Sequence, residues 1–363
     1  MTISALHPCS LHTKRRHPGA GETMGAFVAV TLHHVAQAAG VSIKTVSNVI
    51  NDYPYIREAT RARVLAAIDE LGYQPNLSAR GLRSGRTGAI SLIIPDLKNA
   101  YFAELADAVM EAAAEHDLVV MIQQSAGIRE RELEVLHGPR MRMVDGILFS
   151  VLALGQEDAP LLEIPTPLVL LGERIFNGPA DHVTMQNVAA SRAATEHLIG
   201  LGHRRILAFG AHENEVIGSA GLRLAGYKEA LAAAGLPYSD ELVVNVGNWH
   251  RSDGAEAMRA ALASGRTFDG VVAFNDSIAL GAVRVLQESG IRVPEDVSVI
   301  GFDDIDETRY SLPSLSTVDP GREEIAQTAV RVLVERIAGR DSTIPRVSSR
   351  RHSASCSVSR PQS

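Results

Sequence analysis

The stretch TLHHVAQAAGVSIKTVSNVIN, residues 31–51, decides the fold of the first part of this chain. Apolar residues at helical spacing predict a helix over about 32–39, and Ser42 is a good cap for a second helix over about 43–50. Gly40 between them can adopt the positive φ of a tight turn. Two short helices joined by a glycine-containing turn of three residues are typical of a helix-turn-helix. The alternative is a chance pair of helices in an ordinary core.

A third helix is predicted over 58–71, with Val64, Leu65, Ile68 and Leu71 on one stripe. It supplies the core that a small helical head needs. Gly72 ends it and Pro75 prevents its continuation, so we expect the helix-turn-helix domain to occupy residues 30–75. Arg57 stands where a small polar cap is usual.

The second helix is the expected DNA reader, because a helix-turn-helix places this helix in the major groove. Lysine can reach guanine acceptors, asparagine can pair with adenine, and isoleucine can touch a thymine methyl. Hydroxyl groups nearby can bond phosphate. The candidate DNA-binding residues of the head are Thr31, Ser42, Ile43, Lys44, Thr45, Ser47 and Asn48.

The charge of the chain is unevenly distributed. The formal net charge is −7, yet residues 30–87 hold seven Lys/Arg against four Asp/Glu, which is about +3. The first 29 residues add about +2 and the tail from residue 341 about +3, so the segment 88–340 carries about −15. A basic head on an acidic body suits a protein that meets phosphate at one end.

From residue 88 the pattern changes to strands alternating with helices. Short apolar runs lie at 89–94, 118–122, 146–149, 168–171, 206–209, 242–246, 271–274 and 297–301. Segments with helical spacing separate them, for example 101–114, 222–234 and 277–288, and a helix over 322–338 returns to the first lobe. This alternation predicts parallel, doubly wound sheets. The predicted fold class is therefore α/β, with an all-α helix-turn-helix head and two doubly wound lobes like those of periplasmic binding proteins.

The chain resembles the lactose/galactose-repressor (LacI/GalR) family in several long motifs. In the head these are the opening stretch, TRARVLAAIDELGYQPN and ARGLRSGRTGAI. In the body they are IPDLKNAYFAELADAVMEAA, VDGILF, HLIGLGHRRILAFG, RLAGYKEAL, FDGVVAFNDSIALGA, RVPEDVSVIGFDD and LSTVD. The resemblance extends to about residue 340. It implies a two-lobed effector-binding domain over 88–340, with lobe 1 at about 88–187 and 318–340 and lobe 2 at about 188–317.

The resemblance also implies a hinge over residues 76–87. In the family this segment forms a short helix on operator DNA and places a leucine between base pairs in the minor groove. The residues that match are Asn76, Ala79, Leu82 and Arg83. The segment itself agrees, because it is too short and too rich in Gly and Ser to be a stable isolated helix. An apolar wedge flanked by arginine is a minor-groove device. The alternative is a flexible basic linker.

Mapped motif by motif, the resemblance implies an effector cleft at the ends of several strands. The matching residues are Asn99, Tyr101, Phe102, Arg223, Trp249, Asn275, Asp276 and Asp303. Their donors, acceptors and flat apolar faces suit a sugar or sugar derivative. Other roles stay open for them: Asp276 and Asp303 as helix caps, Phe102 and Trp249 as core residues, and Arg223 as a surface residue.

The sequence departs from the family pattern in three places. Gln186 stands where the family has an aspartate, which removes one charged acceptor for a ligand hydroxyl. Ile217 replaces a basic residue of the purine-sensing branch, which favours a sugar over a purine. The tail over 341–363 lacks the alternating apolar residues of a last strand, so we expect the second lobe to lose an edge strand.

Other classes of protein are poorly supported. The sequence has no GxxxxGK[ST], HExxH or CxxC motif, its 13 histidines are scattered, and Cys9 and Cys356 lie in the tails, so we expect no enzyme, metal or cofactor. No apolar run approaches the ~18 residues of a membrane helix. Residues 1–29, taken as a disordered extension, do not form a secretory signal. A pure periplasmic binding protein fits neither this start nor the head, so a cytoplasmic location is expected.

These features together predict a sequence-specific DNA-binding transcriptional regulator of the repressor kind. A homodimer is expected to bind near-palindromic operator DNA, with an affinity set by a small-molecule effector held between two lobes. No heptad extension follows the body, so a dimer is favoured over a tetramer.

Leu82→Ala is predicted to weaken operator binding far more than binding to unrelated DNA, because the wedge acts only on the specific site. Gel-shift titrations with the two DNAs measure this difference. Equal losses on both would refute the wedge role of Leu82.

Overall fold

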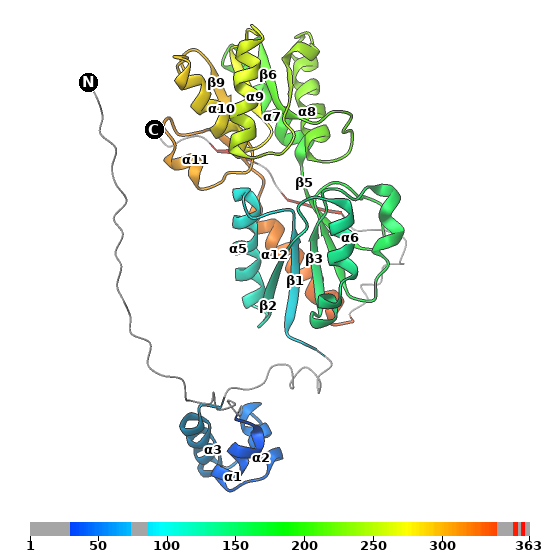
Figure 1. Cartoon of the computed structure of the whole chain (residues 1–363), viewed down its shortest axis with the longest axis vertical. Coiled ribbons are helices and arrows are strands. Elements are labelled where there is room, and N and C mark those ends of the chain that lie inside the picture. The colour runs from blue at the N-terminus through cyan, green and yellow to red at the C-terminus, as the bar shows by residue number, and fades with distance from the viewer. Residues whose placement is uncertain (1–29, 74–85, 340–350, 355–356, 360–363) are drawn as a thin grey trace, which may run out of the picture. The chain divides into compact units, whose positions relative to one another are not determined.

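The computed structural model describes residues 30–73, 86–339, 351–354 and 357–359, and the chain divides into two units, Met1–Asn76 and Leu77–Ser363 (Figure 1). The first unit is the helical head and the second is the two-lobed body. The extension over 1–29 and the hinge residues Asn76, Ala79, Leu82 and Arg83 lie outside the described residues.

Three helices form the head: α1 (Leu32–Ala39), α2 (Ile43–Ile50) and α3 (Glu58–Leu71). Gly40 and Gly72 end α1 and α3 in the left-handed conformation, as expected from their position after each helix. The core is made by Val35, Ala36, Ala39, Val46, Val49, Val64, Ala67 and Tyr73. The prediction for α3 was wrong at Leu65, whose side chain is 50% exposed, because the inward face of this helix runs through Val64 and Ala67 instead.

Local hydrogen bonds fix the start and the end of α2. The hydroxyl of Ser42 accepts from the N–H of Thr45 at 3.1 Å, which confirms the predicted cap. Beyond the helix, Arg61 of α3 pairs with Asp52 at 2.6 Å and donates to the carbonyl of Tyr53 at 3.2 Å. These contacts hold the α2–α3 loop against α3. Arg57 caps α3 without a side-chain hydrogen bond.

Lobe 1 of the body is built on a parallel sheet with the order β11-β5-β4-β3-β1-β2. Its strands are β1 (Ala89–Ile94), β2 (Val119–Gln124), β3 (Gly146–Ser150), β4 (Leu168–Leu171), β5 (Asp181–Met185) and β11 (Arg351–Ala354). Its helices are α5 (Ala100–Ala114), α6 (Arg129–His137), η1 (Pro139–Met143), η2 (Gln156–Leu162) and α12 (Arg322–Ile337). Successive residues of β1 point to opposite faces of the sheet, so Leu92 packs under α5 and α12, whereas Ile93 packs under α6.

Lobe 2 is built on a parallel sheet with the order β7-β6-β8-β9. Its strands are β6 (Ile206–Ala211), β7 (Val243–Asn245), β8 (Gly270–Ala273) and β9 (Ser298–Ile300). Its helices are α7 (Asn187–Gly200), α8 (Ser219–Ala233), η3 (Asp240–Leu242), α9 (Arg251–Ala263), α10 (Asp276–Glu288) and α11 (Glu307–Tyr310). Tyr227 is fully buried in this lobe and donates to the carbonyl of Ile206 at 2.8 Å.

These two parallel-sheet lobes confirm the predicted fold class. Most predicted elements lie within one to three residues of the observed ones. The sequence prediction missed β5, whose DHVTM segment lacks a continuous apolar run although four of its five residues are buried. Its partner β4 and the β11 segment pair with it through backbone hydrogen bonds.

Two segments of the tail form short strands, although neither joins the four-stranded sheet of lobe 2. Arg351–Ala354 forms β11 in parallel pairing with β5, and β12 (Ser357–Ser359) pairs antiparallel with β10 (Thr317–Asp319). Strand pairing uses backbone N–H and C=O groups, so it does not require apolar alternation in the sequence. The remaining tail residues lie outside the described part.

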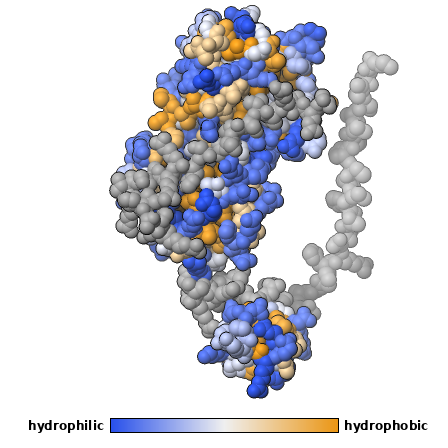
Figure 2. All heavy atoms as spheres, turned by 180° about the vertical axis from the view of Figure 1, so that it is seen from behind, coloured by the Kyte–Doolittle hydropathy of each residue, from blue (hydrophilic) through white to orange (hydrophobic). Residues whose placement is uncertain are grey.

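The face of the molecule seen in Figure 2 is mostly hydrophilic, with hydrophobic residues gathered in smaller patches. This is the surface of a globular domain that buries its apolar side chains between sheet and helices. Among the described helices, none combines the length and apolar character needed to span a bilayer.

Glycines allow the helix pairs of lobe 2 to approach closely. A Cβ on Gly281 of α10 would overlap the backbone carbonyl oxygen of Arg251 in α9, and one on Gly226 of α8 would overlap that of Val188 in α7. Each collision is with backbone, which cannot rotate away. The two helix pairs therefore depend on glycine at these positions.

Gly281→Ala is predicted to destabilise the body by about 1–3 kcal/mol through this overlap. Gly200, in the last turn of α7, is the matched control because a Cβ there meets nothing within 4 Å. Gly200→Ala should leave stability unchanged or raise it by about 0.5–1 kcal/mol. Urea unfolding of both variants measures the difference, and equal stabilities would contradict the packing described for α9 and α10.

Candidate functional site

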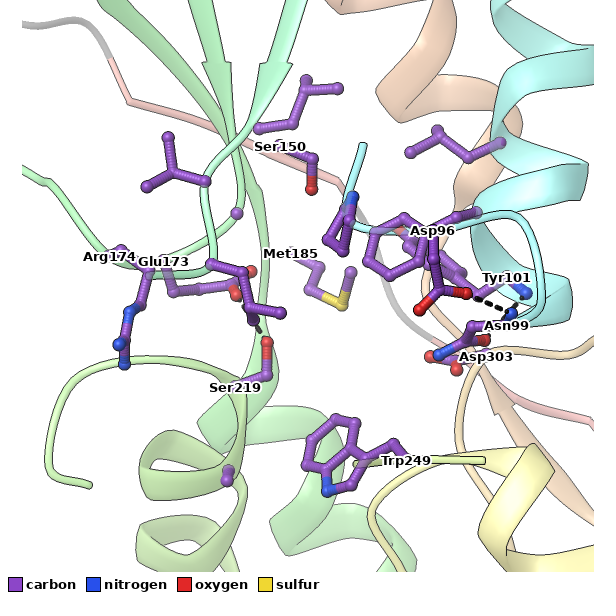
Figure 3. A pocket seen from close by; sticks show the side chains of 18 of the residues that line it. Asp96, Asn99, Tyr101, Ser150, Glu173, Arg174, Met185, Ser219, Trp249 and Asp303 are labelled. Carbon is purple, nitrogen blue, oxygen red and sulfur yellow. Dashed lines mark hydrogen bonds between the residues drawn. The ribbon is translucent and has the colours of Figure 1, made fainter. Parts of the chain in front are cut away.

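A pocket lies between the two lobes, at the carboxyl ends of their parallel strands. This is the edge at which open α/β sheets bind ligands. Residues from both lobes line it, among them Asp96, Asn99, Tyr101, Ser150, Glu173, Arg174, Met185, Ser219, Trp249 and Asp303 (Figure 3). Its volume, taken as space for the centres of water-sized molecules, is ≈170 Å³, whereas one water needs about 10–15 Å³. The pocket can therefore hold a ligand of sugar size.

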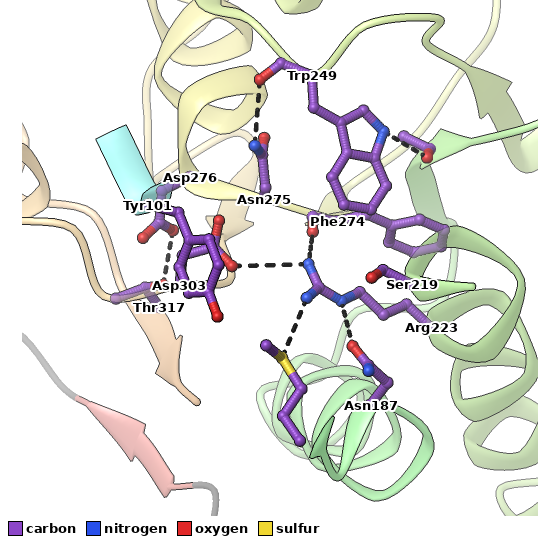
Figure 4. A network of polar contacts seen from close by, with 12 residues as sticks. Tyr101, Asn187, Ser219, Arg223, Trp249, Phe274, Asn275, Asp276, Asp303 and Thr317 are labelled. Atoms are coloured by element: carbon purple, nitrogen blue, oxygen red, sulfur yellow. Dashed lines mark hydrogen bonds and ion pairs between the residues drawn. The ribbon is translucent and has the colours of Figure 1, made fainter. Parts of the chain in front are cut away.

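Arg223, in the second turn of α8, forms the polar wall of the pocket (Figure 4). Its side chain is buried, donates to Asn187 Oδ1 at 2.7 Å and to the carbonyl of Phe274, and lies 3.8 Å from Asp303 Oδ1. The guanidinium also stacks on the ring of Phe302, with its Cζ 3.5 Å from the ring centroid. A guanidinium held on several sides has one fixed orientation toward a ligand.

Asp303 follows β9 and faces Arg223 from the same lobe. Burial raises the pKa of this carboxyl well above its usual value, and the nearby Arg223 acts in the opposite direction. Its φ of 122° is rare for a residue other than glycine, and the next residue, Asp304, has a φ of 50°. The backbone is held there because the Asp303 N–H donates to the carbonyl of Val318 at 2.9 Å and its own carbonyl accepts from Arg322 at 2.9 Å. Backbone strain of this kind tends to occur at functional sites.

Aromatic rings form part of the apolar lining of the pocket. Trp249, after β7, is half-buried and donates its indole N–H to the carbonyl of Gly210 at 3.0 Å. Tyr101 and Phe102 in the first turn of α5 meet edge to face with centroids 5.3 Å apart. Burial, with the charge of Asp303, raises the pKa of the Tyr101 hydroxyl, so this group stays a neutral donor. Flat apolar faces beside fixed polar groups are typical of small-molecule sites.

Hydrogen bonds connect the two lobes around the pocket. Glu173, after β4 of lobe 1, accepts from the hydroxyl of Ser219 in lobe 2 at 2.8 Å and from Thr184 at 2.9 Å. Its neighbour Arg174 donates to the carbonyl of Ile217 at 2.9 Å. A ligand in the pocket would lie among groups of both lobes. The distances between the groups of one lobe and those of the other depend on how far the lobes are closed.

The opposite edge of the pocket has its own contacts between lobes. His250 Nε2 lies 3.5 Å from Asp96 Oδ2. Glu104 of α5 in lobe 1 accepts from the N–H of Asp306 in lobe 2 at 3.0 Å. It also pairs with Arg322 of α12 at 2.8 Å. The pocket is therefore bounded by interlobe contacts on more than one side.

Six of the eight predicted effector residues line this pocket: Asn99, Tyr101, Phe102, Arg223, Trp249 and Asp303. Asn275 and Asp276 do not, because their side chains turn inward. Asn275 caps α10 by accepting from the N–H of Ile278 at 2.9 Å and donates to the carbonyl of Trp249 at 3.1 Å. Asp276 accepts from Thr317 at 2.6 Å, and burial raises its pKa to about 7. Both support the pocket from behind.

Sequence reasoning missed several polar residues of the lining, notably Asp96, Glu173, Arg174, His212 and Glu215. A signal existed for Glu173 and Arg174, because they follow the predicted strand at 168–171 and strand ends meet at the site. Asp96 follows the first strand in the same way. Gln186, the departure from the family pattern, is exposed and outside the lining.

Of the candidate DNA-binding residues of the head, Thr31 caps α1, and the others lie in α2 or at its N-cap. Ile43 and Lys44 are exposed, whereas Ser47 and Asn48 are half-buried because the chain after α2 folds over them. The carbonyl of Asn48 accepts from Tyr53 and that of Ser47 from the side chain of Asn51. The Ser42 and Thr45 hydroxyls bond each other at 2.9 Å. A short helix with its first residues exposed is the geometry of a major-groove reader.

No group of three or more His, Cys, Asp or Glu side chains suited to a metal ion occurs among the described residues.

A helix-turn-helix head joined to a two-lobed body with a pocket at its strand ends defines a ligand-responsive DNA-binding protein. Two family models agree: that of bacterial regulatory proteins of the lacI family matches residues 31–76, and that of periplasmic binding protein-like domains matches residues 195–353.

Similar proteins are known over nearly the whole length. The transcriptional regulator CelR of Thermobifida fusca is 37% identical, covering 85% of this chain and 92% of its own. A solved CelR–cellobiose complex is 31% identical with a TM-score of 0.66, covering 91% and 98%. A lac repressor dimer bound to operator and the anti-inducer ONPF is 28% identical with a TM-score of 0.76, covering 86% and 94%.

The chain belongs to the LacI family of transcriptional regulators. It is a DNA-binding regulator and not an enzyme.

Asn275→Ala is predicted to lower the stability of the body by about 1 kcal/mol, because the N-cap of α10 is lost. The Trp249 carbonyl also loses its donor. Asn245→Ala, at an exposed position of β7, is the control and should change stability by less than about 0.5 kcal/mol. Urea unfolding compares the two, and identical curves would refute the supporting role of Asn275.

Proposed function

We propose that this regulator is a cytoplasmic repressor whose affinity for a near-palindromic operator is set by a sugar bound between its lobes. The observation that carries the proposal is the Arg223–Asp303 wall facing aromatic rings in a pocket lined by both lobes. Paired donors and acceptors suit sugar hydroxyls, and the rings suit the apolar face of a sugar.

The related CelR is known in complex with cellobiose, which supports a sugar as the effector class. The lac repressor relative is a dimer on operator DNA, which supports the same assembly here. Each head would take one half-site through α2, with Ile43, Lys44 and Asn48 as the expected base-contacting residues.

Coupling between sugar and operator follows from the interlobe contacts. A ligand shifts an equilibrium only if it binds one state better than the other. Here the ligand would contact both lobes. The lobes also contact each other directly, through the hydrogen bond from Ser219 to Glu173 and the contact between His250 and Asp96. Changing how the lobes close would move the start of lobe 1, where the chain to the hinge enters β1.

Arg223→Ala is predicted to abolish the effect of the sugar on operator binding while operator binding itself remains. A thermal-shift screen of sugars first identifies a ligand of the wild-type protein, and gel shifts with operator then compare the variants. Arg259→Ala, an exposed arginine on α9, is the matched control and should respond like wild type.

Two outcomes would contradict the proposal. If Arg223→Ala still responded to the sugar as wild type does, Arg223 would not be a ligand residue. If the wild-type protein selected no sequence from random DNA at moderate salt, the assignment as an operator-binding repressor would be wrong.

A further inference from the structure

The charge balance of the pocket lining points to the kind of effector that it accepts. Carboxylates outnumber guanidinium groups by four to two: Asp96, Glu173, Glu215 and Asp303 against Arg174 and Arg223. Each guanidinium already has partners in the protein. Arg223 donates to Asn187 and to the carbonyl of Phe274 and lies 3.8 Å from Asp303, and Arg174 lies 3.5 Å from Glu215. An anionic ligand would therefore compete with these partners for both arginines of the lining.

Glu215 occupies a position that is otherwise suited to an anion. Its Oε1 accepts from the N–H groups of Ala220 and Gly221 at 3.1 and 3.4 Å, in the first turn of α8. Its Oε2 accepts from His212 Nδ1 at 2.8 Å and lies 3.5 Å from Arg174 Nη1. N–H groups at a helix N-terminus together with an arginine and a histidine are the usual partners of phosphate. In this chain the carboxylate of Glu215 occupies the place that a phosphate would take and accepts from these donors.

The carboxylate is held firmly in this position. Its side chain is 16% exposed, and a Cβ on Gly221 would lie 2.5 Å from the Glu215 backbone oxygen, so the loop packs directly on the helix start. Burial acts to raise the pKa of Glu215, but His212, Arg174 and the Gly221 N–H outweigh it and hold the pKa below its ordinary value. The group is therefore ionised at neutral pH.

We propose that Glu215 determines specificity by acting as a built-in anion, which excludes phosphorylated or carboxylated effectors at this end of the pocket and restricts the pocket to neutral sugars. The inference rests on the proposed function, because it assumes that this pocket holds the effector. An incoming phosphate would meet like charge. It would also find the N–H groups of Ala220 and Gly221 and His212 Nδ1 already bonded to Glu215. Shortening the Glu215 side chain should free these donors and turn this place into an anion site.

The experiment measures the binding of inorganic phosphate to the full-length protein by equilibrium dialysis, with fluorescence of Trp249 to locate it. Trp249 is the only tryptophan of the sequence, and its ring centroid lies 5.3 Å from that of His212. The variants are Glu215→Ala and Glu215→Ser, whose short side chains remove the charge and leave the donors free. Glu213→Gln is the matched control: this exposed neighbour lies outside the pocket lining, and its substitution changes the net charge equally.

Both Glu215 variants are expected to bind phosphate at least tenfold more tightly than wild type, with a change in Trp249 fluorescence, whereas Glu213→Gln behaves like wild type. Adding Arg174→Ala to Glu215→Ala should remove the gain. The proposal is overturned if folded Glu215→Ala binds phosphate no better than wild type, or if wild type binds phosphate as tightly as the variants do. If Glu215→Ala does not fold, Glu215→Ser decides the question.

This assay contains neither DNA nor sugar, so its failure is distinguishable from failure of the proposed function. The protein could respond to a neutral sugar on operator DNA while its Glu215 variants gain no phosphate binding. That outcome would support the proposed function and refute the proposed role of Glu215 in specificity. A protein that selected no DNA would lose the function while the anion site of the variants could still be measured.

Discussion

The buried pair of Arg223 and Asp303 is the constraint on which the rest of the site depends. The two residues are 2% and 5% exposed, so the polar groups of neither can be left without partners. Arg223 is satisfied by Asn187 at the start of α7, by the carbonyl of Phe274 after β8 and by the ring of Phe302. The hydrogen bonds and the ring contact of one guanidinium therefore hold several strand and helix ends of lobe 2 in one arrangement. A ligand meets a polar wall that is already ordered, which lowers the entropic cost of binding.

Lobe 1 forms the other side of the pocket, so a ligand there would contact both lobes. Glu173 reaches Ser219 across the lobes, and Arg322 of α12 donates to the carbonyl of Asp303 itself. The residue that would contact the ligand is thus joined through its backbone to a helix of lobe 1. In the proposed function, this contact is the one through which a ligand at Asp303 would act on lobe 1.

Much of this architecture could be predicted from the sequence, for identifiable reasons. Helical spacing in the head and apolar runs in the body are strong signals, and the family resemblance implied a place in the effector cleft for Asp303, at the end of the predicted strand at 297–301. Side-chain direction at a strand–helix junction is not encoded in such patterns. Asn275 and Asp276 therefore were expected in the pocket, whereas the need to cap α10 and to bond Thr317 turns them inward.

Other features lay beyond pattern reasoning. Glu215 sits in a loop without periodicity, and its role depends on the three-dimensional approach of Arg174 from the other lobe. The tail strand at 351–354 has no apolar alternation, since its pairing with β5 uses the backbone. The resemblance to a known family named six residues that line the pocket. It did not indicate which charges this particular chain places there.

The proposed function couples sugar and operator binding through one protein, and this coupling must be reciprocal. The affinity of the screened sugar is measured by Trp249 fluorescence with and without saturating operator. Because coupling is a free energy shared by both ligands, the operator must change sugar affinity by the same factor by which the sugar changes operator affinity. Equal factors in the two titrations are predicted. A sugar affinity that is indifferent to operator, while the sugar still displaced the protein from DNA, would contradict the account.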